Sequence, residues 1–271
     1  MENLIVRCSS LSKLMTRPAG KTNAEKYEEL KALLEEEQQK YDAIEKKASK
    51  TAINKLEKIK NVTAQLMEAE AVKDEWVLSK TAESWIKDEA KQIYYGYRKQ
   101  LKNRYLDKGN ANEDLSIEML NQVTGKNYKK NLERRSLTWL TGEPDIRDEE
   151  ELEIIDMKNA WDLDTFPAYK KDVDETVKAS GYDWQQIGYL ILFPKYKRAR
   201  ICYALTQTPV ELIPNYEDIT LHQVDHIDPK KRITFSSEIL PPTKEVIAEI
   251  KRAYKAGNKF FKECLTELEN K

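Results

Sequence analysis

The stretch TGEPDIRDEEELEIIDMKNAW, Thr141 to Trp161, combines a Pro-Asp pair, a run of acidic residues and an apolar segment that ends in Asp-x-Lys. The apolar segment, Leu152 to Met157, has the composition of a β-strand. Side chains two positions apart point to the same face of a strand, so Asp156 and Lys158 share a face on which Ile154 lies deeper. The stretch therefore predicts an acid and a lysine side by side near a strand end.

A second acid precedes this strand. Asp145 stands at the end of the strand before it, and the acidic turn Arg147 to Glu151 has a length that suits a hairpin. Hairpin pairing would bring Asp145 beside Asp156. Converging carboxylates bind Mg²⁺, and a nearby lysine positions water and offsets charge on a phosphate, so the pattern fits metal-assisted phosphodiester hydrolysis. It also fits a solvated acidic hairpin with an ion pair at a strand end.

Composition limits the wider interpretation. The 271 residues suffice for one domain with an elaboration or for two, and 46 basic against 47 acidic residues give no overall attraction to nucleic acid. Cys8, Cys202 and Cys264 lack C-x-x-C spacing, which argues against zinc clusters, iron–sulfur clusters and disulfide frameworks. The chain has neither a signal-like N-terminus nor an apolar run of roughly 20 residues. We expect a soluble cytoplasmic protein without a membrane span.

Residues 24–101 are predicted to be helical, because Glu, Lys, Ala and Leu dominate there and proline is absent. We expect helices over residues 23–60, 62–79 and 81–105, with the long first helix in a hairpin packed on its own domain rather than in an extended rod. A further helix is expected over Asn112 to Val123, ended by Gly125, with an apolar face formed by Leu115, Met119 and Leu120.

The C-terminal part alternates strands and helices. Strands are expected over Ser136 to Leu140, Leu152 to Met157, Arg200 to Leu205 and Arg232 to Phe235. Helices are expected over Trp184 to Leu192 and over Thr243 to Leu268, the latter capped by Thr243. This order predicts a mixed α/β fold with a central mixed sheet flanked by helices. We expect a helical N-terminal elaboration over residues 1–104 and a core with the C-terminal helix over residues 105–271.

Several motifs together resemble one nuclease superfamily. Pro144-Asp145 followed by Asp156-Met157-Lys158 resembles the PD-(D/E)XK signature of restriction-endonuclease-like nucleases. Lys108 to Glu113 resembles the helical G-x-x-x-E element, and Gln185 to Tyr189 the Q-x-x-x-Y element, of lambda-exonuclease-like and RecB-like nucleases. TGEPDI is similar to the T-G-T-P-D-I form of lambda-type and YqaJ-type phage exonucleases. The likeness covers about residues 105–210, and the segment Arg7 to Lys13 loosely resembles their T-A-S element near a terminal phosphate.

The resemblance implies a restriction-endonuclease-like core and a role for each matching residue. Carboxylates of Glu113, Asp145 and Asp156 and the Met157 carbonyl would bind two Mg²⁺ ions, for which Mn²⁺ would substitute. Lys158 would orient or activate water, and Gln185 and Tyr189, one helical turn apart, would brace the site and touch the phosphate backbone. Asp156 stands where glutamate is more frequent, which shortens the reach by one methylene.

The resemblance also implies an activity. It implies a metal-dependent exonuclease that degrades double-stranded DNA from its ends, 5′ to 3′, in phage-type recombination, with a single-strand annealing protein as partner and a ring-forming trimer as homo-oligomer. DNA would be held by the residues Ser10, Lys13, Arg17, Lys197 and Arg198. Alternatives are an endonuclease or single-strand-specific RecB-like nuclease, and a noncatalytic DNA-binding or scaffold protein.

Two other features have weaker interpretations. His222 and His226 have the i, i+4 spacing of a helical zinc pair, but Pro229 indicates a loop and no third ligand is evident, so surface histidines are favoured. The basic run Lys195 to Arg200 suits either a DNA backbone contact or a solvated turn.

Overall fold

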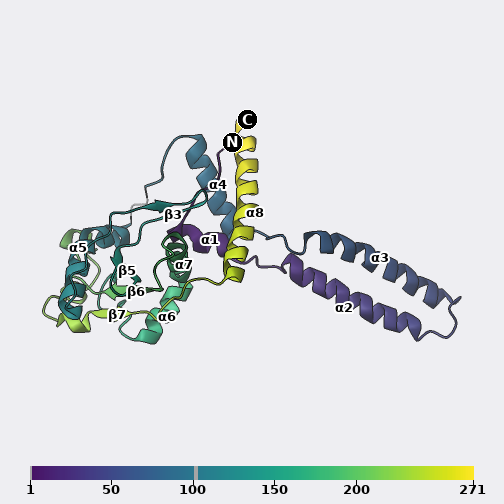
Figure 1. Cartoon of the computed structure of the whole chain (residues 1–271), viewed down its shortest axis with the longest axis horizontal. Helices are drawn as coiled ribbons and strands as arrows, with labels where there is room; N and C mark the ends of the chain where they lie inside the picture. The colour runs from purple at the N-terminus through teal and green to yellow at the C-terminus, as the bar shows by residue number, and fades with distance from the viewer. Residues whose placement is uncertain (1, 101–102) are drawn as a thin grey trace.

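The structure is a computed structural model that describes residues 2–100 and 103–271. Its centre is a four-stranded sheet in the order β4-β5-β6-β7, and a three-stranded sheet in the order β1-β3-β2 lies beside it (Figure 1). The strands are β1 (Val6–Arg7), β2 (Arg135–Ser136), β3 (Leu140–Gly142), β4 (Ile146–Asp148), β5 (Glu153–Asn159), β6 (Arg198–Ala204) and β7 (Ile233–Phe235). Both sheets contain parallel and antiparallel pairs, so the predicted mixed α/β fold is confirmed.

Eight α-helices surround these strands in the described part of the chain. They are α1 (Leu11–Met15), α2 (Asn23–Asp42), α3 (Lys50–Val72), α4 (Lys80–Tyr94), α5 (Arg104–Thr124), α6 (Lys170–Ala179), α7 (Tyr182–Leu192) and α8 (Lys244–Glu269). The short 3₁₀ turns are η1 (Cys8–Ser10), η2 (Val210–Leu212), η3 (Ile219–Leu221) and η4 (Pro229–Lys231). No helix within residues 2–100 and 103–271 has the length and apolarity needed to cross a membrane.

Strand β5 is covered on both faces by helices. Ile154, on one face, is buried in a cluster with Tyr189 of α7, and Ile155, on the other face, is buried in a cluster with Leu120 of α5. A strand that pairs in parallel and is buried on both sides needs the nearly continuous apolar sequence that β5 has. Helix α7 therefore faces the side of β5 that carries Asp156.

The hairpin between β4 and β5 has the predicted register. Ile146 pairs with Ile155 in antiparallel fashion, which places Asp145 next to Asp156 as expected. The Asp148 carboxylate accepts hydrogen bonds of 2.9 Å from the backbone N–H groups of Glu150 and Glu151 and so closes the acidic turn.

The predicted helix over residues 23–60 is wrong, because the chain turns between α2 and α3. Thr22 begins α2 with a capping box, and Ser49 begins α3 by accepting a hydrogen bond from the Ala52 N–H, so each helix has its own start signal. Glu37, which is 2% exposed, binds Lys55 at 2.5 Å and Lys58 at 3.0 Å and joins the two helices.

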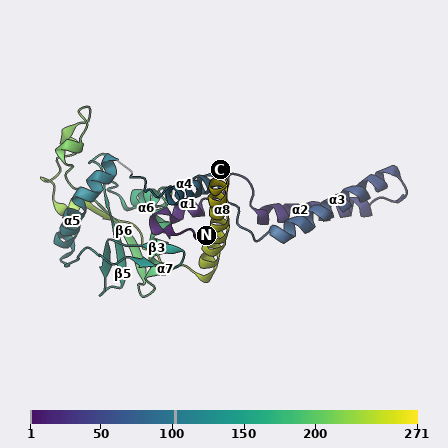
Figure 2. The same cartoon turned by 90° about the horizontal axis from the view of Figure 1, so that it is seen from above.

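The prediction that this hairpin packs on its own domain is wrong. The hairpin extends away from the rest of the chain, which we call the body (Figures 1 and 2). We call α2, α3 and their connection the arm. Its two helices pack chiefly on each other, since charged residues dominate their outer surfaces and leave little apolar area to bury against the body.

Other boundaries also differ from the prediction. Helix α4 ends at Tyr94 because Gly96 takes a left-handed conformation with φ of 63°, and α5 begins at Arg104 rather than near residue 112. Leu115, which was expected on the apolar face, is exposed. Ile117 lies on the buried face instead, beside Met119 and Leu120. The expected strand over residues 136–140 is a β2–β3 hairpin whose turn occupies residues 137–139.

The segment that precedes the arm is part of the core of the body. β1 pairs in parallel with β3, and α1 packs against α7, so Leu4, Val6 and Leu14 are buried together with Tyr189. Helix α8, predicted correctly, lies along α4 (Figure 1). The division of the chain between residues 104 and 105 stays a prediction.

Removing the arm is expected to leave the body folded. The two ends of the arm lie together, because the Asn23 side-chain amide donates hydrogen bonds to the carbonyls of Val72 (3.1 Å) and Glu75 (3.3 Å). Replacing residues 24–74 by a short Gly/Ser linker should reduce the helical circular dichroism by about the 20 and 23 residues of α2 and α3. The melting temperature should change by less than about 5 °C, and a broad or absent transition would contradict the expected independence.

Candidate functional site

The predicted hairpin brings Asp145, Asp156 and Lys158 together. An Asp145 carboxylate oxygen accepts a 2.7 Å hydrogen bond from the Met157 N–H, which fixes Asp145 beside β5. Asp156 is 1% exposed, and the Lys158 ammonium lies 2.5 Å from its Oδ2. The same ammonium lies 4.7 Å from the centre of the Tyr182 ring, so it is held between a carboxylate and an aromatic face.

Helix α7 supplies the other two motif residues. The Gln185 side-chain amide donates hydrogen bonds to Asp156 Oδ1 (3.2 Å) and to the Tyr189 hydroxyl (2.8 Å). Gln185 and Tyr189 are one turn apart on the face of α7 that covers β5. The Q-x-x-x-Y element therefore contacts the D-x-K element directly, and Gln185 fixes the orientation of Asp156.

The electrostatics of this cluster favour a bound cation. Burial, followed by the negative charge of Asp156, raises the pKa of Asp145 to about 8, although the Lys158 ammonium and the Met157 N–H oppose the rise. Burial lowers the pKa of Lys158, but the negative charges of Asp156 and Asp145 raise it. The charges outweigh the burial, so the pKa of Lys158 is above its ordinary value. A buried and a half-buried carboxylate beside one ammonium are thus short of positive charge, and their oxygen donors suit a hard divalent cation.

Glu113 lies at the edge of this cluster. Its negative charge contributes to the raised pKa of Asp145, but its carboxylate is bound to Lys130 at 2.7 Å. The three predicted carboxylates do not all lie within 4.8 Å of one another, in contrast to another group in the described residues. The structure therefore brings Asp145 and Asp156 together and leaves Glu113 nearby, with a lysine as its partner.

The Lys108 side chain, part of the G-x-x-x-E segment, anchors α5. It is 1% exposed, and its ammonium donates to the carbonyls of Ala160 (2.6 Å), Trp161 (2.8 Å) and Thr206 (2.8 Å). Burial lowers its pKa to about 8. Lys108 thus fixes helix α5, which carries Glu113, to the segments that follow β5 and β6. The sequence did not indicate this role of Lys108.

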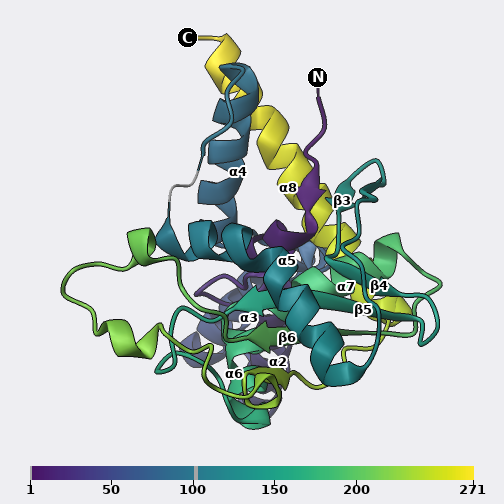
Figure 3. The ribbon, with the colours of Figure 1, turned by 90° about the vertical axis from the view of Figure 1, so that its left-hand side faces the viewer.

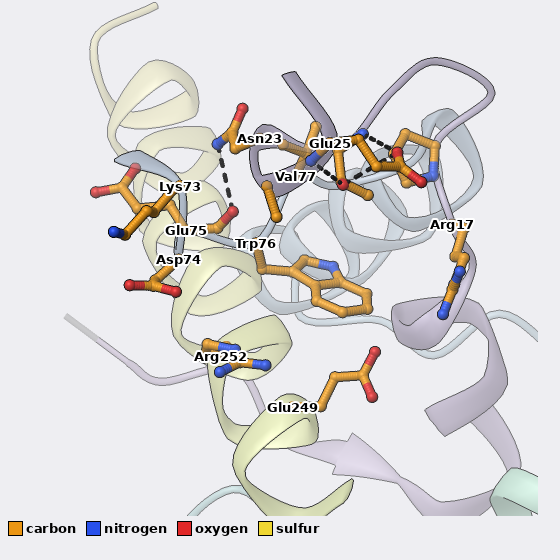
Figure 4. A pocket seen from close by; sticks show the side chains of 13 residues that line it. Arg17, Asn23, Glu25, Lys73, Asp74, Glu75, Trp76, Val77, Glu249 and Arg252 are labelled. Atoms are coloured by element: carbon orange, nitrogen blue, oxygen red, sulfur yellow. Dashed lines mark hydrogen bonds between the residues drawn. The ribbon is translucent and has the colours of Figure 1, made fainter. Parts of the chain in front are cut away.

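The predicted DNA-binding residues of the N-terminal segment do not share one pocket. Ser10 is partly exposed and begins α1, and Lys13 is exposed beside a hollow that Lys178 and Gly181 also line. Arg17 lines a different cavity of about 240 Å³, where Trp76 lies between it and Arg252 (Figure 4). Lys13 and Arg17 therefore line separate hollows, and their roles in DNA binding stay a prediction.

A smaller hollow of about 160 Å³ adjoins Tyr189 and is lined by Arg7 and by Arg134, which binds Glu143 of the same hollow at 3.0 Å. Gly142 permits the close approach there, because a Cβ at this position would lie 2.5 Å from Cys8 Sγ and 2.9 Å from the Tyr189 ring. Arg134 lies outside every motif of the sequence, whereas Arg7 belongs to the T-A-S-like segment, which gives a signal for it.

The basic run Lys195 to Arg200 extends into the start of β6, and its residues divide into two groups. Lys197 is exposed, whereas Arg198 lies 3.1 Å from Glu153 and 3.3 Å from Glu151. Arg200 binds both oxygens of Glu153, at 2.6 and 2.8 Å. Of the two predicted DNA contacts here, Lys197 is available to a phosphate and Arg198 is engaged by acids.

The histidine prediction needs a correction. His222 is 1% exposed rather than on the surface, while His226 is exposed. Asp162 and Glu217 supply the neighbours that the sequence did not reveal, and one atom of each residue of this trio lies within 4.8 Å of the others. Asp162 follows β5, whereas Glu217 and His222 lie in the irregular connection between β6 and β7, so no regular spacing pattern identifies the trio.

The fold and the cluster were compared with known proteins. A phage-related exonuclease from Haemophilus somnus 129PT has a similar structure, with a TM-score of 0.72 and 29% identity over 98% of this chain and 97% of that chain. The resemblance to the PD-(D/E)XK phage exonucleases is confirmed. Because nearly the whole chain is covered, the likeness to this phage exonuclease extends over the N-terminal helices, where the motifs were weak.

A second solved structure is similar to this chain in its fold alone. It is an alkaline exonuclease from Laribacter hongkongensis, with a TM-score of 0.52 and 11% identity over 98% of this chain and 92% of that chain. No protein-family model matches the chain, and no curated protein matches it.

Proposed function

We propose that this protein is a metal-dependent exonuclease that hydrolyses double-stranded DNA from its ends. The observation that carries the proposal is the contact chain from Lys158 to Asp156 to Gln185 to Tyr189, with Asp145 beside it, in a fold similar to a phage-related exonuclease. Each link is made by a side chain of the nuclease motifs.

The residues that would hold the metal are Asp145 and Asp156, with Glu113 and the Met157 carbonyl completing the set. The ions, two Mg²⁺ for which Mn²⁺ substitutes, would supply Lewis acidity and a water activated at neutral pH. The Asp156 side chain is one methylene shorter than that of glutamate and would reach the metal less easily. The hydrogen bond from Gln185, which fixes the orientation of the carboxylate, is therefore important for metal binding. Glu113 has to exchange its contact with Lys130 to take part.

Lys158 and Tyr189 act on the reacting phosphate in this proposal. The raised pKa of Lys158 keeps its ammonium protonated at neutral pH, where it orients water and offsets negative charge that grows on the phosphate. Tyr189 faces the hollow that contains Arg7 and Arg134, so a phosphate in that hollow would lie next to the cluster.

The remaining features of the proposal rest on the family resemblance. They are the 5′ to 3′ polarity, the role in phage-type recombination, a single-strand annealing protein as partner, a ring-forming trimer and a cytoplasmic location. Ser10, Lys13, Arg17 and Lys197 are proposed to contact DNA, and each is at least partly exposed.

The test is digestion of a linear duplex labelled at either the 5′ or the 3′ end, in Mg²⁺ or in chelator. Lys158→Ala is compared with Lys129→Ala, which changes an exposed lysine. Release of mononucleotides from one end, in Mg²⁺ only and lost in Lys158→Ala only, supports the exonuclease. Cleavage of a covalently closed circle would indicate an endonuclease, and an inactive wild type would favour the noncatalytic alternative.

Metal binding is expected to strengthen with pH because of Asp145. Its pKa rises from 3.8 to about 8 in the folded state, so the metal-free protein binds an extra proton between these values and loses stability as the pH rises through about 8. A cation replaces that proton. The increase in melting temperature caused by Mg²⁺ should therefore be larger at pH 9 than at pH 6, and Asp145→Asn should remove this difference. An equal increase at both pH values in the wild type would contradict it.

A further inference from the structure

We propose that Asp162, Glu217 and His222 form a second cation site, specific for a zinc-class divalent ion and separate from the Asp145–Asp156 cluster. Asp162 follows β5, whereas Glu217 and His222 belong to the long connection from β6 to β7. One ligand atom of each lies within 4.8 Å of the other two, which is close enough for a single ion to contact all three.

The hydrogen bonds around His222 fix its tautomer. Thr208 Oγ1 donates its proton to the Trp161 carbonyl at 2.8 Å, so it can only accept at the 3.1 Å contact with His222 Nδ1. Nδ1 of neutral His222 therefore carries the proton, and its Nε2 presents a lone pair. Zinc-binding histidines commonly have this arrangement, with the second nitrogen donating to a polar partner.

The lone pair of His222 has no hydrogen-bond donor to meet. Nε2 is buried and without a hydrogen-bond partner among the described residues, and it faces Glu217 Oε2 at 3.2 Å. A neutral imidazole nitrogen and a carboxylate oxygen repel each other at this distance unless a proton on Nε2 or a metal cation lies between them. The buried histidine thus points to a ligand within the trio.

Neighbouring side chains and backbone groups orient both carboxylates. Glu217 Oε1 binds Arg104 at 2.9 Å, and its Oε2 accepts a hydrogen bond of 2.8 Å from the Trp161 indole. Asp162 Oδ1 accepts from the backbone and the hydroxyl of Thr165, at 2.8 and 2.6 Å, and the described chain gives its other oxygen no donor. The trio is therefore held in place before an ion binds.

The donor set indicates the class of ion. One imidazole and two carboxylates suit Zn²⁺, Co²⁺ or Mn²⁺, whereas Mg²⁺ prefers oxygen ligands alone. The two carboxylates carry two negative charges, of which Arg104 already offsets one, so the trio keeps net negative charge for a cation. The Trp161 ring lies 5.3 Å from the His222 ring. Three protein ligands leave a fourth position for water.

An ion here would fix the β6–β7 connection to the rest of the body. This connection loops out beside the start of α5 (Figure 3), and Glu217 already binds Arg104 at that start. A bound ion would join it to the segment after β5 through Asp162. The inference does not depend on nuclease activity, because none of its ligands belongs to the catalytic motifs.

Cobalt binding tests the inference. The metal-free Asp145→Asn/Asp156→Asn protein, which lacks the other carboxylate cluster, is titrated with Co²⁺ and then with Zn²⁺. We expect one equivalent with the intense visible absorption of a low-coordinate cobalt site, displaced by Zn²⁺. Asp162→Asn, which keeps the acceptor for Thr165, and His222→Gln should each weaken binding by about 100-fold or more, and Thr208→Val by roughly 10- to 100-fold.

The matched control is Asp164→Asn, which neutralises an exposed acid two residues from Asp162 and should leave binding unchanged. Equal affinity in Asp162→Asn and Asp164→Asn would overturn the site, and Asp162→Asn decides the question if His222→Gln does not fold. Absence of Co²⁺ binding to the Asp145→Asn/Asp156→Asn protein would also overturn it and would leave the His222–Glu217 contact as an ion pair. Neither result bears on DNA digestion, which is measured separately.

Discussion

Asp156→Asn is expected to lower the rate of DNA digestion by on the order of 1,000-fold, about 4 kcal/mol of activation free energy. Asparagine keeps the acceptor for Gln185 but removes the charge that holds the Lys158 ammonium 2.5 Å away and that would bind the metal. Both the metal ligand and the position of the lysine are lost together. Initial rates on an end-labelled linear duplex at saturating Mg²⁺ measure the effect.

Asp148→Asn is the matched control for this substitution. Asp148 is also a buried aspartate of the β4–β5 hairpin, and asparagine keeps the acceptor for the N–H groups of Glu150 and Glu151. We expect it to retain most of the activity. If Asp156→Asn kept more than about a tenth of the wild-type rate, with an unchanged fold by circular dichroism, Asp156 would not be a metal ligand in the reaction.

Lys108→Met is expected to lower the free energy of unfolding by about 3–5 kcal/mol. The methionine fills similar space but leaves the carbonyls of Ala160, Trp161 and Thr206 without their shared donor in a buried site. Because Lys108 and Glu113 lie on one helix, the digestion rate should also fall. Urea unfolding followed by circular dichroism measures the stability.

Lys129→Met serves as the comparison, since it removes an exposed lysine shortly after α5. Its unfolding midpoint should lie close to that of the wild type. A loss below about 1 kcal/mol in Lys108→Met would mean that water replaces the ammonium and that the three carbonyl contacts contribute little.

The part of the candidate site that could be predicted from sequence is local. Asp156 and Lys158 alternate within one strand, Asp145 is one hairpin away, and Gln185 and Tyr189 are one helical turn apart, so strand and helix geometry place each pair. The final helix α8 could also be predicted from the sequence, because Thr243 after two prolines marks its start.

Features that depend on distant partners were not predictable in this way. β1 is two residues long and exists because it pairs with β3, more than a hundred residues later, so its sequence carries no signal of its own. The break between α2 and α3 was hidden by helix-favouring residues on both sides of it. Irregular backbone brings together Asp162, Glu217 and His222. Neither the helical nor the strand periodicity of side chains applies to such segments.

The Leu4 N–H donates a 2.8 Å hydrogen bond to the side chain of Asn258 in α8, a separation of 254 positions along the chain. During synthesis the ribosome therefore releases the first strand long before its partners in β3, α7 and α8 exist. The arm can form at once, because its two helices are neighbours in sequence, whereas the body must wait until α8 has been made. Until then the apolar residues Leu4, Val6 and Leu14 lack the partners that bury them in the folded protein.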